Sequence, residues 1–374
     1  MALRWTYTLS LTLVVWDAER VRRGEMTNSH DTQTARTPRI LHLTECYAGG
    51  VSRAIETIVD LTPEAEHHLL WRGDESPEAT IGYASRRDLP ASFRRAIRRV
   101  RDVVEEVSPD FVYAHSSWAG VFARATRLDA PVVYAPHCYK FDDASTSAPL
   151  RTAYRLAEVA LARRTARTIV LSPHEEALAL AVNKKVPTHY VPNVASVEPD
   201  EAHPATRFAA ARDVIMIGRL SKQKDPSFFA HVARRVHDVA PDVRFRWIGD
   251  GDMDKRAELE AVGVEVTGWL YGEALAAELA RPSVYLHTAL YEGFPLSVLD
   301  AAAFEHPILA RHIPAFDGLT IPTAESADDA ALMVLDLLSS GPHLAQAEQA
   351  ARDLRSTMNR DAQRAALQAL YAAV

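Results

Sequence analysis

Short β-branched runs alternate with longer amphipathic stretches along almost the whole chain from Arg39 onward. The run Arg39–Leu43 predicts a strand, and Val51–Leu61, which follows a Gly-Gly pair, has the apolar spacing of a helix. Strands of four to six residues that alternate with helices of ten to fifteen are typical of βαβ units and of a parallel, doubly wound sheet. The sequence therefore predicts an α/β fold.

The alternation stops once and then restarts. Residues 198–208 contain two prolines and clustered charges, which predicts a linker at 198–212. Because 374 residues exceed what one ordinary core accommodates, we expect two Rossmann-like domains, at 39–197 and 213–355, that face each other across a cleft. The helical stretch Ala345–Ala373 closes the chain, and we expect its end, residues 356–374, to pack back on the N-terminal domain.

The first 38 residues do not share the alternation. Their longest apolar run, Leu9–Trp16, is much shorter than the ~20 residues that a membrane span needs. We expect residues 1–38 to form a weakly structured extension, with Met26 as an alternative start that would leave residues 1–25 untranslated.

Composition excludes several classes of protein. The formal net charge is −7, so electrostatics disfavours a nucleic-acid binder. The two cysteines, Cys46 and Cys138, are too few for a disulfide framework or a four-thiolate zinc site. We expect a cytoplasmic protein.

Two loops at predicted strand ends could bind phosphate. Gly49-Gly50 opens the first helix, where glycine permits close approach of the backbone and a helix start favours an anion. The loop Gly218–Lys224 (GRLSKQK) places Arg219 and Lys224 five residues apart, so that both cations can converge on a diphosphate. The alternatives are a tight turn for the glycines and a solvated basic loop for the cations.

A third loop, Tyr291–Asp300 (YEGFPLSVLD), combines two acids with a helix start. Glu292 lies at a predicted strand end, and Pro295 suits the first position of the next helix. Asp300 follows about one and a half helical turns later, so both carboxylates can face one wall of a cleft and accept from sugar hydroxyls. The alternative is a pair of ordinary surface acids.

Taken together, these loops resemble the retaining glycosyltransferases of family 4, which have the GT-B fold. The resemblance rests on Gly218–Lys224, on Ile248–Gly251 (IGDG), and on E-G-F-P followed by an acid eight residues after the glutamate. In the first half, Ala114–Gly120 (AHSSWAG) and Tyr134–Phe141 (YAPHCYKF) are similar to the H-S-S-K-A-G and T-P-H-G-F-x-F segments of bacterial members that build surface polysaccharides. The resemblance spans about residues 39–374.

The resemblance implies a role for each matching residue. Arg219 and Lys224 match the cations that hold the donor's diphosphate, Glu292 matches the acid that binds hydroxyls of the transferred sugar, and His137 matches the histidine near the reacting sugar. These four are the expected catalytic residues. Asp300 matches the acid that binds the nucleotide ribose.

The expected donor contacts also include a set of loop residues that present main-chain groups or allow close approach. They are Gly49, Gly50, Gly218, Gly293, Phe294, Pro295 and Leu296. The N-terminal domain is expected to bind the acceptor and the C-terminal domain the donor.

Three positions depart from the family pattern. Asp300 stands where glutamate is usual and is one methylene shorter, which puts the ribose contact in doubt. Trp118 replaces the usual lysine of the first motif. Cys138 replaces a glycine that normally lets the loop pass close to the sugar.

No metal is expected at the site. Asp252-Met253-Asp254 fits the D-x-D signature of another glycosyltransferase fold, but it directly follows the IGDG strand end and more simply caps the next helix. The cofactor expectation is therefore none, with a nucleotide-diphosphate sugar as co-substrate.

The resemblance implies an enzyme, a retaining hexosyltransferase that moves a sugar from a nucleotide-diphosphate donor to a glycan or lipid-linked acceptor in cell-surface polysaccharide biosynthesis. One alternative is a nucleotide-sugar 2-epimerase of the same fold. Another is a non-catalytic protein that binds sugar nucleotides. The sequence does not identify the sugar, the base, the acceptor, the linkage or the oligomeric state.

The predicted helix Ala91–Val107 concentrates positive charge in a half that is otherwise balanced, with 19 Lys/Arg against 19 Asp/Glu over residues 40–195. Phe93, Ile97, Val100 and Val104 form an apolar stripe at helical spacing. A docking surface for the anionic inner face of the membrane is one interpretation, and an ordinary amphipathic helix that packs on the sheet is the other. The cations concerned are Arg94, Arg95, Arg98, Arg99 and Arg101.

Overall fold

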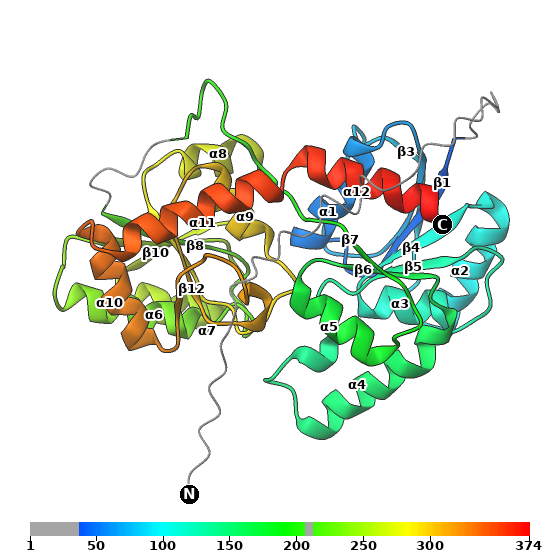
Figure 1. Ribbon diagram of the computed structural model, residues 1–374, viewed down its shortest axis with the longest axis horizontal. Coiled ribbons are helices and arrows are strands. Elements are labelled where there is room, and N and C mark those ends of the chain that lie inside the picture. Colours follow the sequence, from blue (N-terminus) through cyan, green and yellow to red (C-terminus); the bar gives the residue numbers. More distant parts are fainter. Residues whose placement is uncertain (1–36, 206–211) are drawn as a thin grey trace, which may run out of the picture. The chain divides into compact units, whose positions relative to one another are not determined.

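Each half of the chain folds around a sheet of parallel strands. The computed structural model describes residues 37–205 and 212–374, and Thr37–Val374 form one compact unit. The first sheet has seven strands in the order β3-β2-β1-β4-β5-β6-β7, and the second has six in the order β10-β9-β8-β11-β12-β13 (Figure 1). All their pairings are parallel. The predicted α/β architecture of two Rossmann-like sheets is confirmed.

The elements alternate regularly along both halves. The first half consists of β1 (Arg39–Thr44), α1 (Gly49–Leu61), β2 (Glu66–Trp71), β3 (Tyr83–Asp88), α2 (Phe93–Val107), β4 (Phe111–His115), α3 (Ser117–Arg124), β5 (Val132–Ala135), η2 (Lys140–Asp142), α4 (Ala148–Leu161), η3 (Ala162–Arg164), β6 (Arg167–Val170), α5 (Pro173–Val182) and β7 (Thr188–Tyr190). The second half consists of β8 (Asp213–Ile217), α6 (Pro226–His237), β9 (Arg244–Ile248), α7 (Met253–Glu260), β10 (Val264–Gly268), α8 (Gly272–Leu279), β11 (Val284–His287), α9 (Leu296–Ala303), β12 (Ile308–Arg311), η4 (Pro314–Phe316), β13 (Thr323–Ala324), α10 (Ala327–Leu338), α11 (His343–Thr357) and α12 (Arg360–Ala373).

The central strands are buried on both faces, which is why the sequence predicts them as short apolar runs. In β1, Leu41 and Leu43 belong to one core cluster and Ile40 to another, because successive side chains point to opposite faces of the sheet. The edge strand β3 was not predicted. Its sequence, YASRRD, alternates half-buried and exposed side chains and offers no apolar run.

The last helical stretch is two helices instead of one. α11 contacts α9 in the second half, whereas α12 contacts α1 in the first (Figure 1). Leu367 and Leu370 of α12 are fully buried in the same cluster as Ile40. The chain turns at Met358 and Asn359, and the Asn359 side chain accepts a hydrogen bond from Ala362 N at 3.0 Å. The expected boundary at 355/356 therefore falls inside α11 and is corrected to this cap.

The segment that follows β7 is tied to the second half before the predicted linker begins. Asn193 Nδ2 donates to Phe294 O at 2.8 Å. Residues 206–211 of the predicted linker 198–212, and residues 1–36 of the predicted extension, lie outside the described residues. Within residues 37–205 and 212–374, no helix has both the length and the apolarity needed to cross a membrane.

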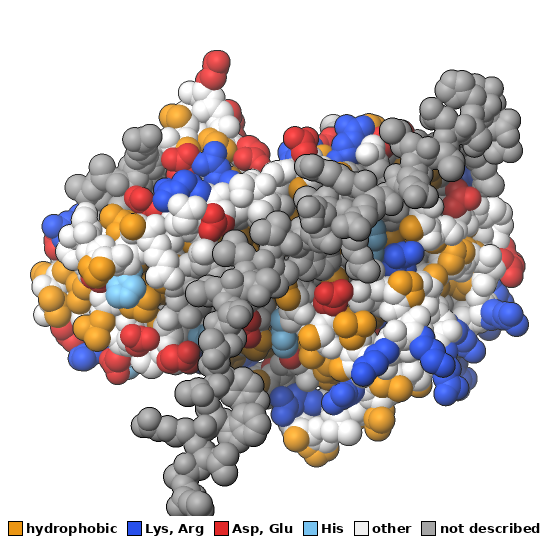
Figure 2. Space-filling view, viewed as in Figure 1, with side chains coloured by type: hydrophobic (Ala, Val, Ile, Leu, Met, Phe, Trp, Pro, Cys, Tyr) orange, Lys and Arg blue, Asp and Glu red, His pale blue; other side chains and the backbone are white. Residues whose placement is uncertain are grey.

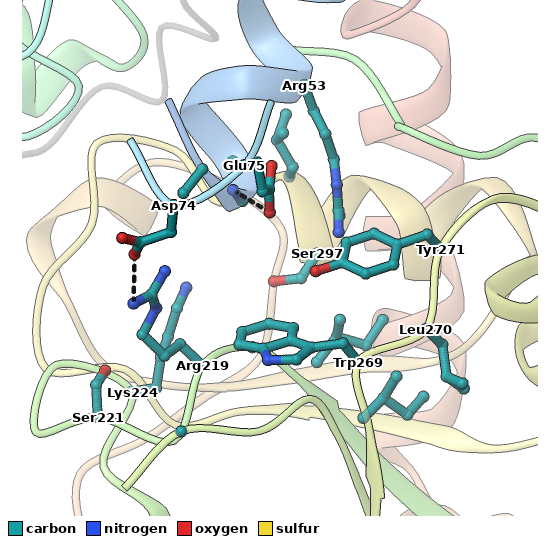
Figure 3. Close-up of a pocket in the computed structure, with 18 of the residues that line it drawn as sticks. Arg53, Asp74, Glu75, Arg219, Ser221, Lys224, Trp269, Leu270, Tyr271 and Ser297 are labelled. Atoms are coloured by element: carbon teal, nitrogen blue, oxygen red, sulfur yellow. Dashed lines mark hydrogen bonds and ion pairs between the residues drawn. The ribbon is translucent and has the colours of Figure 1, made fainter. Parts of the chain in front are cut away.

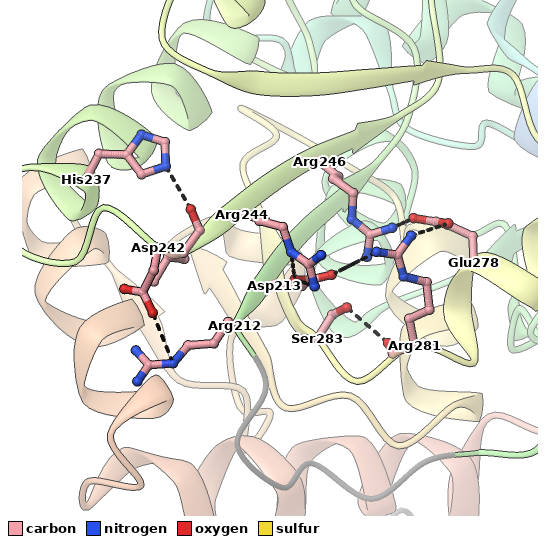
Figure 4. A network of polar contacts seen from close by, with 10 residues as sticks. Arg212, Asp213, His237, Asp242, Arg244, Arg246, Glu278, Arg281 and Ser283 are labelled. Atoms are coloured by element: carbon pink, nitrogen blue, oxygen red, sulfur yellow. Dashed lines mark hydrogen bonds and ion pairs between the residues drawn. The ribbon is translucent and has the colours of Figure 1, made fainter.

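A buried ionic network stabilises the amino ends of the strands in the second sheet (Figure 4). The Asp213 carboxylate accepts from Arg244 at 2.7 Å and from Arg246 at 2.8 Å, and Arg246 also pairs with Glu278. Because Arg246 is almost fully buried, its charge needs both carboxylates. The network lies at the strand ends opposite those that carry the Gly218–Lys224 and Tyr291–Asp300 loops, so its role is structural.

The strand order places a crevice in each half. In both sheets the order in which strands are added reverses beside the first strand, between β1 and β4 and between β8 and β11. Ligands of open α/β sheets bind at such a switch point, outside the carboxyl ends of the strands. The loops singled out in the sequence follow β1, β8 and β11, and so they start at these two crevices.

Candidate functional site

A cavity of ≈ 500 Å³ lies where the carboxyl-end loops of the two sheets meet (Figure 3). The first half contributes the loop after β1, the start of α1 and the loop after β2. The second half contributes the loops after β8, β9 and β10 and the start of α9. The lining residues are Ala48, Gly49, Gly50, Arg53, Asp74, Glu75, Ile217, Gly218, Arg219, Ser221, Gln223, Lys224, Ile248, Gly251, Trp269, Leu270, Tyr271, Leu296 and Ser297.

Two predicted cations, Arg219 and Lys224, lie together on the wall of this cavity (Figure 3). Arg219 is half exposed, with its Nη1 3.8 Å from Asp74 Oδ2 and its guanidinium 5.8 Å from the Trp269 ring. Lys224 is more buried, and its Nζ lies 2.5 Å from Glu292 Oε1. Each cation thus has one carboxylate partner, and the two remain close enough to the cavity to meet an anion there.

The loop that holds these cations is bound to the loop after β11. Leu290 N donates to Gln223 O at 2.8 Å, and Thr288 Oγ1 donates to Lys224 O at 2.6 Å. Gln223 Nε2 donates to Tyr291 O at 3.0 Å. These bonds hold Lys224 against Glu292, so the two predicted loops form one rigid wall.

Glycine is required where the IGDG run passes the β8 loop. Gly249 has φ +142°, and a Cβ there would clash with the Gly218 carbonyl. Gly218 N in turn donates to Ile248 O at 2.9 Å. The close approach of these two loops explains why glycine follows both strands.

The glycine pair at the start of α1 lines the cavity as predicted, but the helix start already holds a carboxylate. Gly49 N donates to Glu75 Oε1 at 3.0 Å, and Ser52 Oγ donates to Glu75 Oε2 at 2.6 Å. A helix start favours an anion, and in this structure the Glu75 carboxylate occupies that position, while the expected donor contact of Gly49 and Gly50 stays a prediction.

Of the third predicted loop, only part reaches the cavity. Leu296 and its neighbour Ser297 line it, whereas Glu292 lies behind Lys224. Phe294 packs in the second core, and its carbonyl accepts from Asn193 in the segment after β7. Pro295 precedes α9 as its cap instead of occupying the first helical position.

Asp300 is placed differently from the expectation. Its side chain is 0 % exposed and lies outside the cavity lining. Its Oδ1 accepts hydrogen bonds from Ser196 N at 2.6 Å and from Ser196 Oγ at 2.9 Å. Burial raises the pKa of Asp300 to about 6, against an opposing effect of Arg53. In this structure Asp300 anchors the segment that joins the two halves.

His137 lies on a tightly held loop after β5. His137 and Cys138 have φ +48° and +87°, in the left-handed region that disfavours side chains. Glu175 holds this loop, because its Oε1 accepts from Cys138 N at 2.9 Å and its Oε2 accepts from Leu171 N at 2.8 Å. Burial raises the pKa of Glu175 to about 7.

The same loop meets the E-G-F-P turn from the other half. A Cβ built on Gly293 would lie only 3.1 Å from Cys138 N. The structure thus brings the backbone of Gly293 against the residue that follows His137. Glycine at 293 leaves room for the Cys138 backbone.

Several cavity residues were not predicted from the sequence. Trp269 and Tyr271 follow β10, are 42 % and 48 % exposed, and stack with ring centroids 6.4 Å apart. Arg53 reaches over the Tyr271 ring at 5.3 Å (Figure 3). Two exposed aromatic residues directly after a strand end were the signal that could have identified this wall. Asp74 and Glu75 had no comparable signal, since they lie in a loop without a motif.

The D-x-D segment caps a helix, as predicted. Asp252 Oδ1 accepts from Asp254 N at 2.9 Å and from Lys255 N at 3.2 Å, at the start of α7. Across the described ranges, no group of three or more His, Cys, Asp and Glu side chains is arranged to hold a metal ion.

Family comparisons agree with this division of the chain. Residues 38–194 match the family described as glycosyl transferase 4-like domain, and residues 211–340 match the family described as glycosyl transferases group 1. The two matches together cover well over half of the sequence.

Two of the curated relatives are bacterial proteins. A 41.2 kDa protein of the cps region of Klebsiella pneumoniae is 25% identical over 308 residues, which cover 75% of this chain and 84% of the relative. The Escherichia coli UDP-Gal:α-D-GlcNAc-diphosphoundecaprenol α-1,3-galactosyltransferase is 25% identical over 236 residues, 54% of this chain and 58% of that enzyme. The alignment thus spans less than two thirds of the E. coli enzyme.

Solved structures show the same fold at low sequence identity. Sucrose-phosphate synthase from Thermosynechococcus elongatus superposes with a TM-score of 0.75 at 16% identity, covering 90% of this chain and 98% of that one. Anabaena HepE in complex with UDP and glucose superposes with a TM-score of 0.73 at 15% identity, covering 90% and 100%. The architecture is therefore GT-B.

The burial of Asp300 generates a test of its structural role. Because its pKa is raised from 3.8 to about 6 on folding, the stability linked to its protonation is full below about pH 4 and is lost as the pH rises through about 6. We expect Asp300→Asn to remove this loss. The free energy of unfolding of the variant, relative to that of the wild type, should therefore rise by up to about 3 kcal/mol between pH 4 and 7.

Urea denaturation across this pH range measures the difference. Asp129→Asn, in an exposed loop of the first half, is the matched control and should run parallel to the wild type. A difference between Asp300→Asn and wild type that stays constant with pH would contradict the assignment.

Proposed function

The chain belongs to the family-4-like glycosyltransferases of GT-B fold, and on that premise we propose that it transfers a hexose from a nucleoside diphosphate donor with retention of the anomeric configuration. The acceptor that we propose is a glycan or a lipid-linked sugar, as in the E. coli galactosyltransferase that it resembles. The product would be part of a cell-surface polysaccharide.

The observation that best supports a nucleotide-sugar donor is the composition of the cavity wall. Arg219 and Lys224 offer two cations at a strand end, and the backbone at Gly218 is open to close approach. The exposed rings of Trp269 and Tyr271 offer a stacking surface of the kind that a nucleobase uses. A donor in which a diphosphate links a base to a sugar matches this arrangement of aromatic rings beside two cations.

We further propose that the cations act on the leaving group. When the glycosidic bond to the donor breaks, negative charge develops on the diphosphate, and preorganised positive groups stabilise it most in that state. Arg219 supplies a bidentate guanidinium and Lys224 a compact ammonium. The start of α9, which no side chain caps, presents its dipole to the same space. These groups would fill the role that a metal ion has in other enzymes, and we propose a reaction without one.

Glu292 and His137 are proposed to hold the sugar. The carboxylate of Glu292 lies 2.5 Å from Lys224, so a sugar bound to Glu292 would be next to a diphosphate bound to Lys224. The His137 loop adjoins Gly293 across the cleft and would enclose the sugar from the first half. We assign no enzymic nucleophile, since front-face attack with the diphosphate oxygen accepting the acceptor's proton accounts for retention.

Incubation with a panel of nucleoside diphosphate hexoses tests the proposed reaction. We expect one donor to be hydrolysed slowly without an acceptor, and the sugar released first to have the donor's anomeric configuration in ¹H NMR spectra. Release of the opposite anomer would exclude retention. Conversion of the donor to its C2 epimer would identify an epimerase, and an unchanged but tightly bound donor would identify a non-catalytic binding protein.

The donor clamp predicts the effect of a single substitution. Arg219→Ala should lower kcat/KM by about 10²–10³, the loss that follows removal of one group that stabilises the transition state. Lys222→Ala, an exposed lysine of the same loop outside the cavity lining, is the matched control and should retain activity. EDTA should leave the wild type active. Near-normal kinetics of Arg219→Ala, or loss of activity on chelation, would contradict the proposed role of the cations.

We also propose that the first half docks on an anionic membrane surface. In α2, Val100 and Val104 of the apolar stripe are buried against the sheet, as an ordinary amphipathic helix requires. Its cations remain outside: Arg94, Arg95, Arg98 and Arg101 are exposed and Arg99 is half-buried.

A second helix on the same side supports the membrane proposal. α4 has only one buried residue, Glu158, and it exposes Leu150, Leu156 and Val159. Figure 2 shows apolar and basic side chains side by side over α2 and α4. Apolar side chains among arginines suit the boundary between lipid headgroups and acyl chains, where each basic residue contributes ~1 kcal/mol on an anionic leaflet.

Sedimentation with vesicles of mixed phosphatidylglycerol and phosphatidylcholine tests this surface. Replacing Arg94, Arg95 and Arg98 together by Gln should weaken binding at least tenfold, and high salt should weaken binding of the wild type. Replacing the exposed Arg235, Arg352 and Arg364 by Gln gives the same change of charge elsewhere and should have little effect. Equal binding by both triple variants would exclude α2 as the docking surface.

A further inference from the structure

Four histidine rings form a continuous hydrogen-bonded row across the first sheet. His67 lies on β2, His42 on β1, His115 at the end of β4 and His137 in the loop after β5. Consecutive rings are joined by nitrogen pairs at 3.0 Å (His67 Nδ1 to His42 Nε2), 3.1 Å (His42 Nδ1 to His115 Nε2) and 3.1 Å (His115 Nδ1 to His137 Nε2). The row thus follows the strand order β2-β1-β4-β5 and ends at the proposed sugar site.

The groups beside the far end of the row, at His67, accept hydrogen bonds from it but cannot donate to it. His67 Nε2 lies 2.9 Å from the Thr62 carbonyl oxygen, which has no proton to give. It also lies 3.2 Å from Thr62 Oγ1, whose own proton is donated to Ile58 O at 2.7 Å. Both neighbours therefore require a proton on His67 Nε2.

A neutral imidazole carries a proton on only one nitrogen, so this end sets the direction of the whole row. With Nε2 protonated, His67 Nδ1 must accept, and His42 must donate from its Nε2. The same step repeats at His115 and then at His137. Each ring is protonated on Nε2, and each Nδ1 except the last accepts from the next ring.

The rings are kept neutral by their surroundings. Burial lowers the pKa of His42, His115 and His67, and it lowers that of His137 to about 4. The row's hydrogen-bond partners among the described residues are the imidazoles themselves and Thr62. A second proton on the row would have no carboxylate bonded to it.

We propose that this row is a positioning device that holds His137 as its Nε2–H tautomer, with an unprotonated Nδ1 available to accept a hydrogen bond from a hydroxyl of the bound sugar. Within the described part of the chain, His115 is the only residue that hydrogen-bonds to the His137 ring. His67, His42 and His115 act through His137 and do not touch the substrate. The tautomer follows from the hydrogen bonds alone, whereas the sugar contact rests on the proposed function.

The row also excludes a different role for His137. Passing a proton along the row would require His67 to deliver one to the Thr62 carbonyl, which is not a base. His137 is therefore an acceptor of a hydrogen bond at neutral pH, and a relay to solvent through His67 is not available.

Two-bond and three-bond ¹H–¹⁵N correlation spectra of the ¹⁵N-labelled full chain test the tautomer directly. The signals of His137 are assigned by their loss in His137→Gln. In the wild type we expect a single neutral His137 species with a protonated Nε2. A protonated Nδ1, or a mixture of both tautomers, would overturn the proposal without any measurement of activity.

Substitution at the far end tests the coupling along the row. His67→Leu removes the acceptor that His42 needs and should let His137 populate the Nδ1–H tautomer, with kcat/KM reduced about five- to tenfold, as expected for one lost hydrogen bond. His67→Asn places an oxygen near the position of Nδ1 and should restore the wild-type spectrum. His68→Asn, on the same strand and outside the row, is the control.

Nucleotide binding and thermal melting show whether each variant is folded. A folded His67→Leu protein whose His137 spectrum matches the wild type would overturn the coupling. If the spectra change as expected but no donor is turned over by the wild type, the row stands and the proposed transferase reaction fails.

Discussion

A parallel sheet delivers the loop after every strand to the same edge, and the rest of this structure depends on that constraint. In both halves the strand order reverses beside the first strand, so the loops after β1 and β8 each open onto a crevice. Gly49, Gly218 and Lys224 reach one cavity for this reason, although the first is far from the others in the sequence. The amino-end edge of the second sheet carries the structural network around Asp213 and Arg246.

The cations Arg219 and Lys224 of the cavity each have a carboxylate partner. Asp74 faces Arg219, Glu292 pairs with Lys224, and Glu75 occupies the start of α1. A nucleoside diphosphate is negatively charged, as are Asp74 and Glu292, the two carboxylates that face these cations. Binding of the proposed donor would therefore exchange one set of partners of Arg219 and Lys224 for another.

The two halves are joined by contacts that use backbone as much as side chains. Asp300 binds Ser196, Asn193 binds the Phe294 carbonyl, and Gly293 lies against Cys138. All three involve the E-G-F-P loop and the helix that follows it. The same loop and helix thus shape the proposed sugar site and fix the connection between the halves. For this reason Asp300, which was predicted to bind the ligand, is buried and has a structural role.

The sequence by itself determined the α/β alternation, the two sheets, the family and the cations Arg219 and Lys224, because buried strands and motif loops leave a local pattern of residue types. It did not reveal Glu75 at the start of α1, the burial of Asp300 or the stack of Trp269 on Tyr271. Nor did it reveal that His67, His42, His115 and His137 form one row, since these residues lie on four elements with no common spacing. Only the tertiary structure decided these features, because each depends on which strands become neighbours and how closely two distant backbones approach.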